Sequence, residues 1–235
     1  MKKPGLTSPD SIRYESTMIS MCRFLIVKSK KNESTSKFLQ KFAELCRTSE
    51  KWQGDGWGIY YLQGSEWKNH KSTKSIWDEK EMFGRIPESS FFVAHARGAF
   101  GKDTVNIENV QPFSESGMIY VFNGHMKKVR LKMKGNIGAA KIFNMLLEQS
   151  KETRSLEKAI LNTKDLVEQN SAFIEAMNIA IVDAEGKVYV LCKHSGDVDY
   201  HGIRYFQNPE ITVICSKGIE DYNFKIMENN KLMVF

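Results

Sequence analysis

Two amphipathic stretches lie in the middle of the chain, and short apolar runs lie before and after them. Short apolar runs bounded by polar residues or Gly are typical of buried strands. They are residues 22–28, 57–62, 91–97, 118–122, 177–182, 187–192, 211–215 and 231–235. The central stretches 138–149 and 155–169 predict a helix pair, and a further helix is predicted to begin at Thr35 or Ser36. This order predicts an α+β domain in which two packed sheets lie between helix layers.

The composition is that of an ordinary globular protein. Its 235 residues are 41% hydrophobic, enough for one large domain or two small ones, and no internal repeat is present. The net charge of +6 comes from lysines spread along the chain, with one basic stretch at 127–134. Its alternating pattern favours a strand edge with a solvated basic face over a nucleic-acid contact.

The cysteines argue against a metal site or a disulfide scaffold. Cys22, Cys46, Cys192 and Cys215 lie far apart and form no CxxC pair. This spacing suits a reducing, cytoplasmic location. No stretch is apolar for long enough to cross a membrane, and nothing in the sequence requires a metal or an organic cofactor.

Residues 1–21 differ in composition from the rest of the chain. They are polar and rich in Ser, Thr and Pro, with no apolar segment of the kind found in secretory signals. We expect a disordered leader here, and a folded domain over residues 22–235. The leader is either a propeptide removed before Cys22 or a segment upstream of a true start at Met21.

Cys22 follows Met21 directly and begins the first apolar run. If Cys22 becomes the first residue, it carries both a thiol and a free α-amine. An α-amine titrates near pH 8, so it can act as the base for its own side chain. The alternative is a buried structural cysteine in a strand.

Two further polar features stand at the ends of apolar runs. Arg97 follows residues 91–96, and its guanidinium is suited to holding a carboxylate at two points. A structural ion pair with Asp55 or Asp103 is the alternative. His95, two residues earlier, is expected to be structural.

Asn123 and Gly124 follow residues 118–122. They offer a side-chain NH₂ and an unobstructed backbone N–H, which are the donors of an oxyanion hole. Asn-Gly is also a common turn, and this is the alternative.

The order of these motifs resembles the class II glutamine amidotransferases. The motifs are Met-Cys-Arg-Phe-Leu at 21–25, Gly-Asp-Gly-Trp-Gly-Ile at 54–59, His-Ala-Arg at 95–97, Asn-x-Gln-Pro-Phe at 109–113 and Phe-Asn-Gly-His at 122–125. The family consists of N-terminal-nucleophile (Ntn) hydrolases with a four-layer αββα fold. The stand-alone members, without a fused synthase domain, are most similar.

The resemblance implies a role for four residues. Cys22 would be the nucleophile, activated by its own α-amine, and would form a γ-glutamyl thioester that water hydrolyses. Asn123 and Gly124 would form the oxyanion hole. Arg97 would hold the α-carboxylate of the glutamyl group. The segments 55–58 and 111–113 would frame the pocket.

The sequence departs from the family pattern at three places. Family members have an acid that binds the substrate's α-ammonium in the segment entering the helix after the Asn-Gly strand, whereas residues 136–143 contain no acid and Gly138 stands at that position. Gln111 replaces a His of the usual motif. The third departure is the leader before Cys22.

These features lead to a prediction of an enzyme that hydrolyses a γ-glutamyl amide, either glutamine or a derivative. A stand-alone glutaminase would waste ammonia, so either a synthase partner subunit exists or the enzyme is a true amidohydrolase. The alternative is a catalytically degenerate protein of the same fold that acts as a binding or regulatory subunit. The sequence leaves the substrate and the oligomeric state open.

Overall fold

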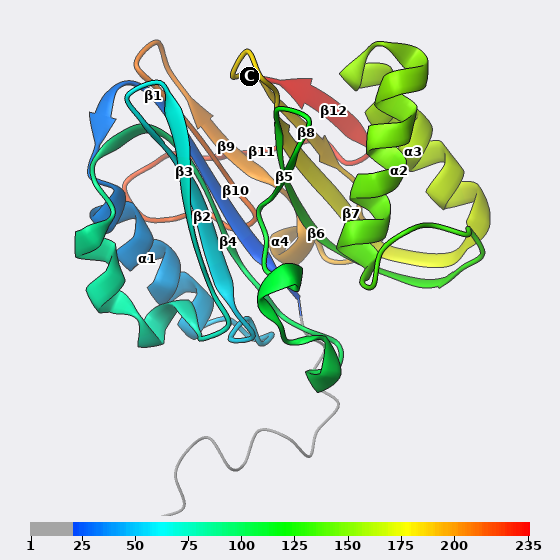
Figure 1. Cartoon of the computed structure of the whole chain (residues 1–235), viewed down its shortest axis with the longest axis horizontal. Coiled ribbons are helices and arrows are strands. Elements are labelled where there is room, and N and C mark those ends of the chain that lie inside the picture. Colours follow the sequence, from blue (N-terminus) through cyan, green and yellow to red (C-terminus); the bar gives the residue numbers. More distant parts are fainter. Residues whose placement is uncertain (1–20) are drawn as a thin grey trace, which may run out of the picture.

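The computed structural model describes residues 21–235, with the exception of the Lys102 side chain. The predicted leader lies outside the described residues apart from Met21. Within the described part, two antiparallel sheets are packed face to face, with α1 on one outer side and α2 and α3 on the other (Figure 1). No helix in residues 21–235 is long and apolar enough to cross a membrane.

The first sheet has seven strands in the described part of the chain. In spatial order they are β11 (Lys225–Ile226), β9 (Arg204–Gln207), β10 (Ile211–Cys215), β1 (Arg23–Glu33), β4 (Ser89–Ala96), β2 (Trp57–Gln63) and β3 (Glu66–Ser72). Helix α1 (Thr35–Arg47) covers its outer face. Phe38, Leu39 and Phe42 of α1 pack there against alternate residues of the central strands, including Leu25 and Val27 of β1.

The second sheet has five strands within residues 21–235. In spatial order they are β12 (Lys231–Val234), β8 (Val188–Cys192), β7 (Ser171–Val182), β6 (Met118–Val129) and β5 (Phe113–Glu115). The helix pair α2 (Gly138–Thr153) and α3 (Leu156–Asn170) covers its outer face. The short elements are α4 (Val198–His201) and 3₁₀ turns at Ile76–Asp78, Lys80–Arg85, Lys102–Thr104 and Ile107–Asn109.

A third apolar core lies between the two sheets. It is formed by the inward-facing residues of both sheets, among them Phe24 and Ile26 of β1 and Ile119 and Val121 of β6. Because side chains alternate along a strand, the same strands also supply the two outer cores. The predicted arrangement of two packed sheets between helix layers is therefore confirmed as a four-layer αββα sandwich.

Two details differ from the sequence-based expectation. The first strand extends beyond the predicted apolar run 22–28 and continues through the polar residues 29–33. The run at 118–122 does not end at Asn123-Gly124, because β6 continues to Val129 and pairs with β7 along this length. Asn-Gly favours turns in isolation, but here the pairing with β7 keeps the backbone extended.

Candidate active site

Cys22 is placed by the alternation of β1. Phe24 and Ile26 face the core between the sheets, so Cys22, two residues before Phe24, extends this series at the start of the strand. The preceding Met21 is only 1% exposed. The nitrogen of Cys22 is thus held in a peptide bond next to a buried side chain.

His95 and Arg97 are placed in the same way by β4. Phe91 and Val93 of this strand face the core between the sheets, and His95 and Arg97 continue the series. In the pairing of β1 with β4, Arg23 lies opposite Ala96. Arg97 therefore lies beside the start of β1, where Cys22 is.

Strand β6 brings Asn123 to this end of the sandwich from the other sheet. Ile119 and Val121 face the core between the sheets, and Asn123 is the next residue in that series. Three strands from the two sheets therefore bring Cys22, Arg97 and Asn123 to the same end of the sandwich.

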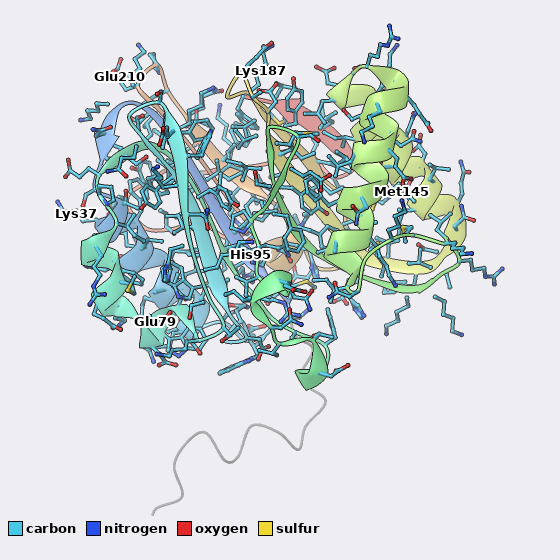
Figure 2. All side chains as sticks on the ribbon, in the orientation of Figure 1. Lys37, Glu79, His95, Met145, Lys187 and Glu210 are labelled. Carbon is cyan, nitrogen blue, oxygen red and sulfur yellow. The ribbon has the colours of Figure 1, made fainter. Side chains whose placement is uncertain are left out.

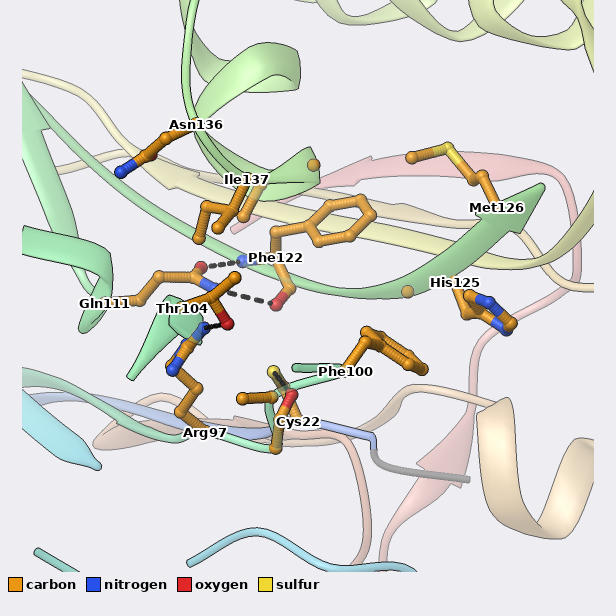
Figure 3. A pocket seen from close by; sticks show the side chains of 15 residues that line it. Cys22, Arg97, Phe100, Thr104, Gln111, Phe122, His125, Met126, Asn136 and Ile137 are labelled. Atoms are coloured by element: carbon orange, nitrogen blue, oxygen red, sulfur yellow. Dashed lines mark hydrogen bonds between the residues drawn. The ribbon is translucent and has the colours of Figure 1, made fainter. Parts of the chain in front are cut away.

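A cavity of about 390 Å³ opens at this place (Figure 3). The predicted site residues Cys22, Arg97 and Gly124 line it together. The other lining residues come from the connection after β4, from β6 and from the start of α2: Gly98, Ala99, Phe100, Thr104, Gln111, Phe122, His125, Met126, Asn136, Ile137, Gly138 and Ala139. Asn123 lies between the lining residues Phe122 and Gly124, but its own side chain is buried behind the cavity surface.

The Cys22 thiol is partly buried, and its Sγ lies 3.8 Å from the carbonyl oxygen of Gly98. Burial raises the pKa of this thiol, while the contact with Gly98 and the nearby positive charge of Arg97 oppose the rise. The thiol is therefore protonated at neutral pH and needs a base before it can act as a nucleophile.

Arg97 is 4% exposed, and its guanidinium has only neutral hydrogen-bond partners. It donates to Thr104 Oγ1 at 2.9 Å and to the main-chain oxygen of Asp55 at 3.4 Å. The Asp55 carboxylate instead accepts from Ala99 N at 2.7 Å and Trp52 Nε1 at 2.9 Å. Among the described residues no carboxylate forms an ion pair with Arg97, so the structural ion pair considered from the sequence is absent there. Burial lowers the pKa of Arg97, and a bound carboxylate would offset this cost.

The register of β6 and β7 directs the backbone N–H of Gly124 away from β7. Gly124 lies opposite Met177, whose N–H donates to Lys193 O on the far side of β7. In an antiparallel pair, opposite residues either exchange both bonds or neither, so Gly124 turns its N–H to the open edge of β6. A Cβ on Gly124 would lie 2.3 Å from Ala176 O, which explains why glycine is needed here.

Two buried side chains hold Phe122 on the same edge. Gln111 Oε1 accepts from Phe122 N at 2.6 Å, and Gln111 Nε2 lies 3.4 Å from Phe122 O. His95 Nε2 lies 3.3 Å from the same oxygen, and because a carbonyl only accepts, this nitrogen carries the proton. Burial lowers the pKa of His95 to about 3, so the ring is neutral. Figure 2 shows His95 near the middle of the molecule, whereas Lys187 and Glu210 lie at its edge.

Asn123 is 1% exposed, and its Nδ2 and Oδ1 have no hydrogen-bond partner among residues 21–235. Its neighbour across the sheet, Asn178, is fully bonded: it donates to His201 O at 2.7 Å and accepts from Lys193 N at 3.0 Å. Buried amides are normally hydrogen-bonded, so the Asn123 amide differs from Asn178 in having both polar atoms free of protein partners among the described residues.

The rim of the cavity contains an aromatic pair. Phe100 stacks on the ring of His125 with centroids 4.5 Å apart. His125 Nδ1 lies 2.9 Å from a carboxylate oxygen of Glu175, which also bonds Lys51 at 3.0 Å and lies 3.3 Å from His201 Nε2. This network fixes the orientation of the His125 ring.

The family resemblance pointed to the start of α2 through Gly138, which lines the cavity. The Gln111–Phe122 contact and the burial of Met21 have no direct signal in the sequence. Gln111 lies in the connection between β4 and β5, and the resemblance implied only that residues 111–113 frame the pocket. Within residues 21–235, no group of three or more His, Cys, Asp or Glu side chains could hold a metal ion.

Comparison with known proteins yields structural matches only. No protein-family model and no curated protein sequence matches the chain. A glutamine phosphoribosylpyrophosphate (PRPP) amidotransferase from B. subtilis matches with a TM-score of 0.65 and 13% identity, over 91% of this chain and 47% of that one. The chain thus spans about half the length of that protein.

Two shorter solved proteins match over nearly their whole length. A glutamine aminotransferase class-II domain protein from Silicibacter pomeroyi has a TM-score of 0.60 and 10% identity, over 91% of this chain and 94% of that one. A predicted glutamine amidotransferase from Pseudomonas aeruginosa has a TM-score of 0.55 and 14% identity, over 92% and 97%. The chain therefore has the Ntn-hydrolase fold of the class II glutamine amidotransferases, as its motifs implied.

Proposed function

We propose that the chain is an amidohydrolase of the class II glutamine amidotransferase type, which cleaves a γ-glutamyl amide through Cys22. The observation that carries this proposal is the meeting of the Cys22 thiol, the Arg97 guanidinium and the open edge of Gly124 at one cavity. The shared fold of solved glutamine amidotransferases supports it.

The reaction begins with proton transfer from the Cys22 thiol to its own α-amine. The thiolate then attacks the amide carbon, and the oxyanion that forms accepts a hydrogen bond from Gly124 N–H. Asn123 Nδ2 supplies a second hydrogen bond once its side chain turns from the wall toward the cavity. Collapse of this intermediate breaks the C–N bond, and the protonated amine returns its proton to the departing nitrogen, which leaves as ammonia. Water, activated by the same amine, then hydrolyses the thioester.

This mechanism requires a free α-amine on Cys22. In the proposal, the segment 1–21 is removed, or translation begins at Met21 and this residue is then cleaved. Residues 22–235 are the catalytic domain. The free thiol that the reaction needs is consistent with a cytoplasmic location, and all four cysteines are unpaired.

The substrate side of the proposal rests on Arg97, which would hold the α-carboxylate of the glutamyl group in the cavity. The ammonia released either passes to a synthase partner or is lost as product. A degenerate binding subunit is the second candidate, and it is favoured by one observation: no Asp or Glu lines the cavity, so the α-ammonium of free glutamine has no anionic partner there.

Ammonia release separates these two candidates. A chain that begins at Cys22, verified by intact mass, is assayed with glutamine, N-acetylglutamine and glutaramate, the analogue without the α-amino group. We expect release from at least one of them, a loss of at least about 1,000-fold in Cys22→Ala and near-normal activity in Cys192→Ala, whose thiol lies outside the cavity. Absence of release from all three would favour the binding subunit.

A further inference from the structure

The charge of the cavity wall is one-sided. Arg97 is a permanent cation in the lining, and none of the fifteen lining residues is Asp or Glu. A carboxylate on the ligand can thus pair with Arg97, whereas an ammonium group on the ligand finds no carboxylate in the wall to pair with.

Two carboxylates, those of Asp55 and Glu175, are bonded to residues of the cavity wall, and each also has other hydrogen-bond or ion-pair partners. Asp55 accepts from the backbone of Ala99 and from Trp52, within 2.9 Å of each. Glu175 is bonded to Lys51 and His125 and lies close to His201. Turning either one toward a ligand would break these contacts, so neither replaces a missing acid.

The start of α2 adds to this asymmetry. Asn136 to Ala139 line the cavity, and the first turn of the helix contains no acidic residue. A helix N-terminus carries a partial positive charge that favours anions and disfavours cations. Figure 3 shows Asn136 and Ile137 across the cavity from Cys22 and Arg97.

We propose that the cavity selects γ-glutamyl amides whose α-nitrogen is uncharged or absent, such as N-acylated glutamine derivatives. This inference rests on the proposed function and names its substrate class. Arg97 holds the α-carboxylate, and the neutral α-substituent lies toward the start of α2. An ammonium group there would lose water without gaining an anionic partner.

The size of the cavity agrees with this class. A volume of about 390 Å³ lies at the lower end of the range for small-molecule sites. The exposed side chain of Phe100 and the half-buried His125 at the rim offer an apolar stacked surface for an acyl group.

The test compares three probes with the chain that begins at Cys22. Glutamine has an α-ammonium, N-acetylglutamine has a neutral amide in its place, and glutaramate has neither. We expect kcat/KM for ammonia release to be at least about tenfold higher for one of the two uncharged probes than for glutamine.

A single substitution is expected to reverse this preference. Gly138 is the exposed first residue of α2, and a Cβ added there has no atom within 4 Å. In Gly138→Asp, the new carboxylate supplies the missing anion, and the preference for an uncharged probe should fall at least about tenfold. Gly84→Asp is the matched control, because Gly84 is exposed, equally open and outside the cavity.

The outcomes distinguish this inference from the proposed function. If glutamine is used as well as or better than both uncharged probes, the inference is wrong and the proposed function stands. If Gly138→Asp leaves the preference unchanged while Gly84→Asp behaves like the parent, the assigned place of the α-nitrogen is wrong. If no probe releases ammonia, the proposed function fails and the inference fails with it.

Discussion

At the level of single residues, we expect a substitution of Asn123 to lower catalysis without lowering stability. Its buried amide has no partner among the described residues, so we expect it to cost stability and to contribute only when an oxyanion forms. Asn123→Leu should therefore lower kcat about 100-fold or more, while the free energy of unfolding stays unchanged or rises by up to about 1 kcal/mol.

Asn178 provides the control for this prediction, since it lies opposite Asn123 and is fully hydrogen-bonded. Asn178→Leu should lower the free energy of unfolding by about 2 kcal/mol, because it leaves the buried His201 carbonyl and the partly buried Lys193 N–H without partners. Urea unfolding and steady-state kinetics on both variants measure the difference. A large loss of stability in Asn123→Leu would show that this amide is structural.

The buried, neutral His95 should make the free energy of unfolding depend on pH. Its pKa is about 3 in the folded chain and about 6.5 when unfolded, so between these values only the unfolded state binds the proton. The free energy of unfolding therefore falls as the pH drops below 6.5, by roughly 2 kcal/mol between pH 6.5 and 4.5.

The comparison with His95→Gln isolates this effect from other titrating groups. Glutamine at this position can still donate to Phe122 O but does not titrate. Urea unfolding at both pH values should show the extra loss in the parent and not in the variant. Equal losses in the two proteins would contradict the assignment of a neutral, buried His95.

At the scale of elements, the outer edge of β6 depends on a side chain. Strand β5 pairs with β6 only as far as Tyr120, and the next group on that edge, Phe122, is bonded by Gln111. Gln111→Leu should lower the free energy of unfolding by about 1–3 kcal/mol and lower kcat about tenfold with little change in KM. Gln111 thus acts as a positioning residue for Gly124.

The control for Gln111 is the exposed Gln207, whose change to Leu should alter stability by less than about 0.5 kcal/mol. Thermal unfolding and the separate kcat and KM values test this prediction. A rise in KM with an unchanged kcat would instead place Gln111 in substrate binding.

The elements also show what the sequence could predict. The apolar runs and the helix pair predicted the layers of the fold correctly. Strands that are buried on both faces appear in the sequence as continuous apolar runs, so they can be recognised without other information. The end of β6 was misplaced at Asn123-Gly124. Local preference indicated a turn there, whereas the close approach of Ala176 O, from a strand about 50 residues away, decides the conformation.

At the scale of the whole molecule, the site depends on contacts that no single segment encodes. Cys22, Arg97 and Gly124 were identified from the sequence because each stands at the end of an apolar run, and the sandwich brings them to one cavity. The bond from Gln111 to Phe122 and the burial of Met21 follow only from the packing of the two sheets, because neither has a distinctive signal in the sequence. The absence of an acid in residues 136–143, seen in the sequence, extends in the structure to the entire wall.

Removal of Met21 decides whether the α-amine of Cys22 can act as the base for its thiol. The kcat/KM for ammonia release is measured for the chain that begins at Cys22 and for a chain in which Met21 still precedes it, each verified by intact mass and assayed with the best of the three probes. We expect at least about 1,000-fold higher kcat/KM for the first chain, with activity rising as the pH increases through the pKa of the amine near 8. Equal activity in the chain that keeps Met21 would contradict this expectation.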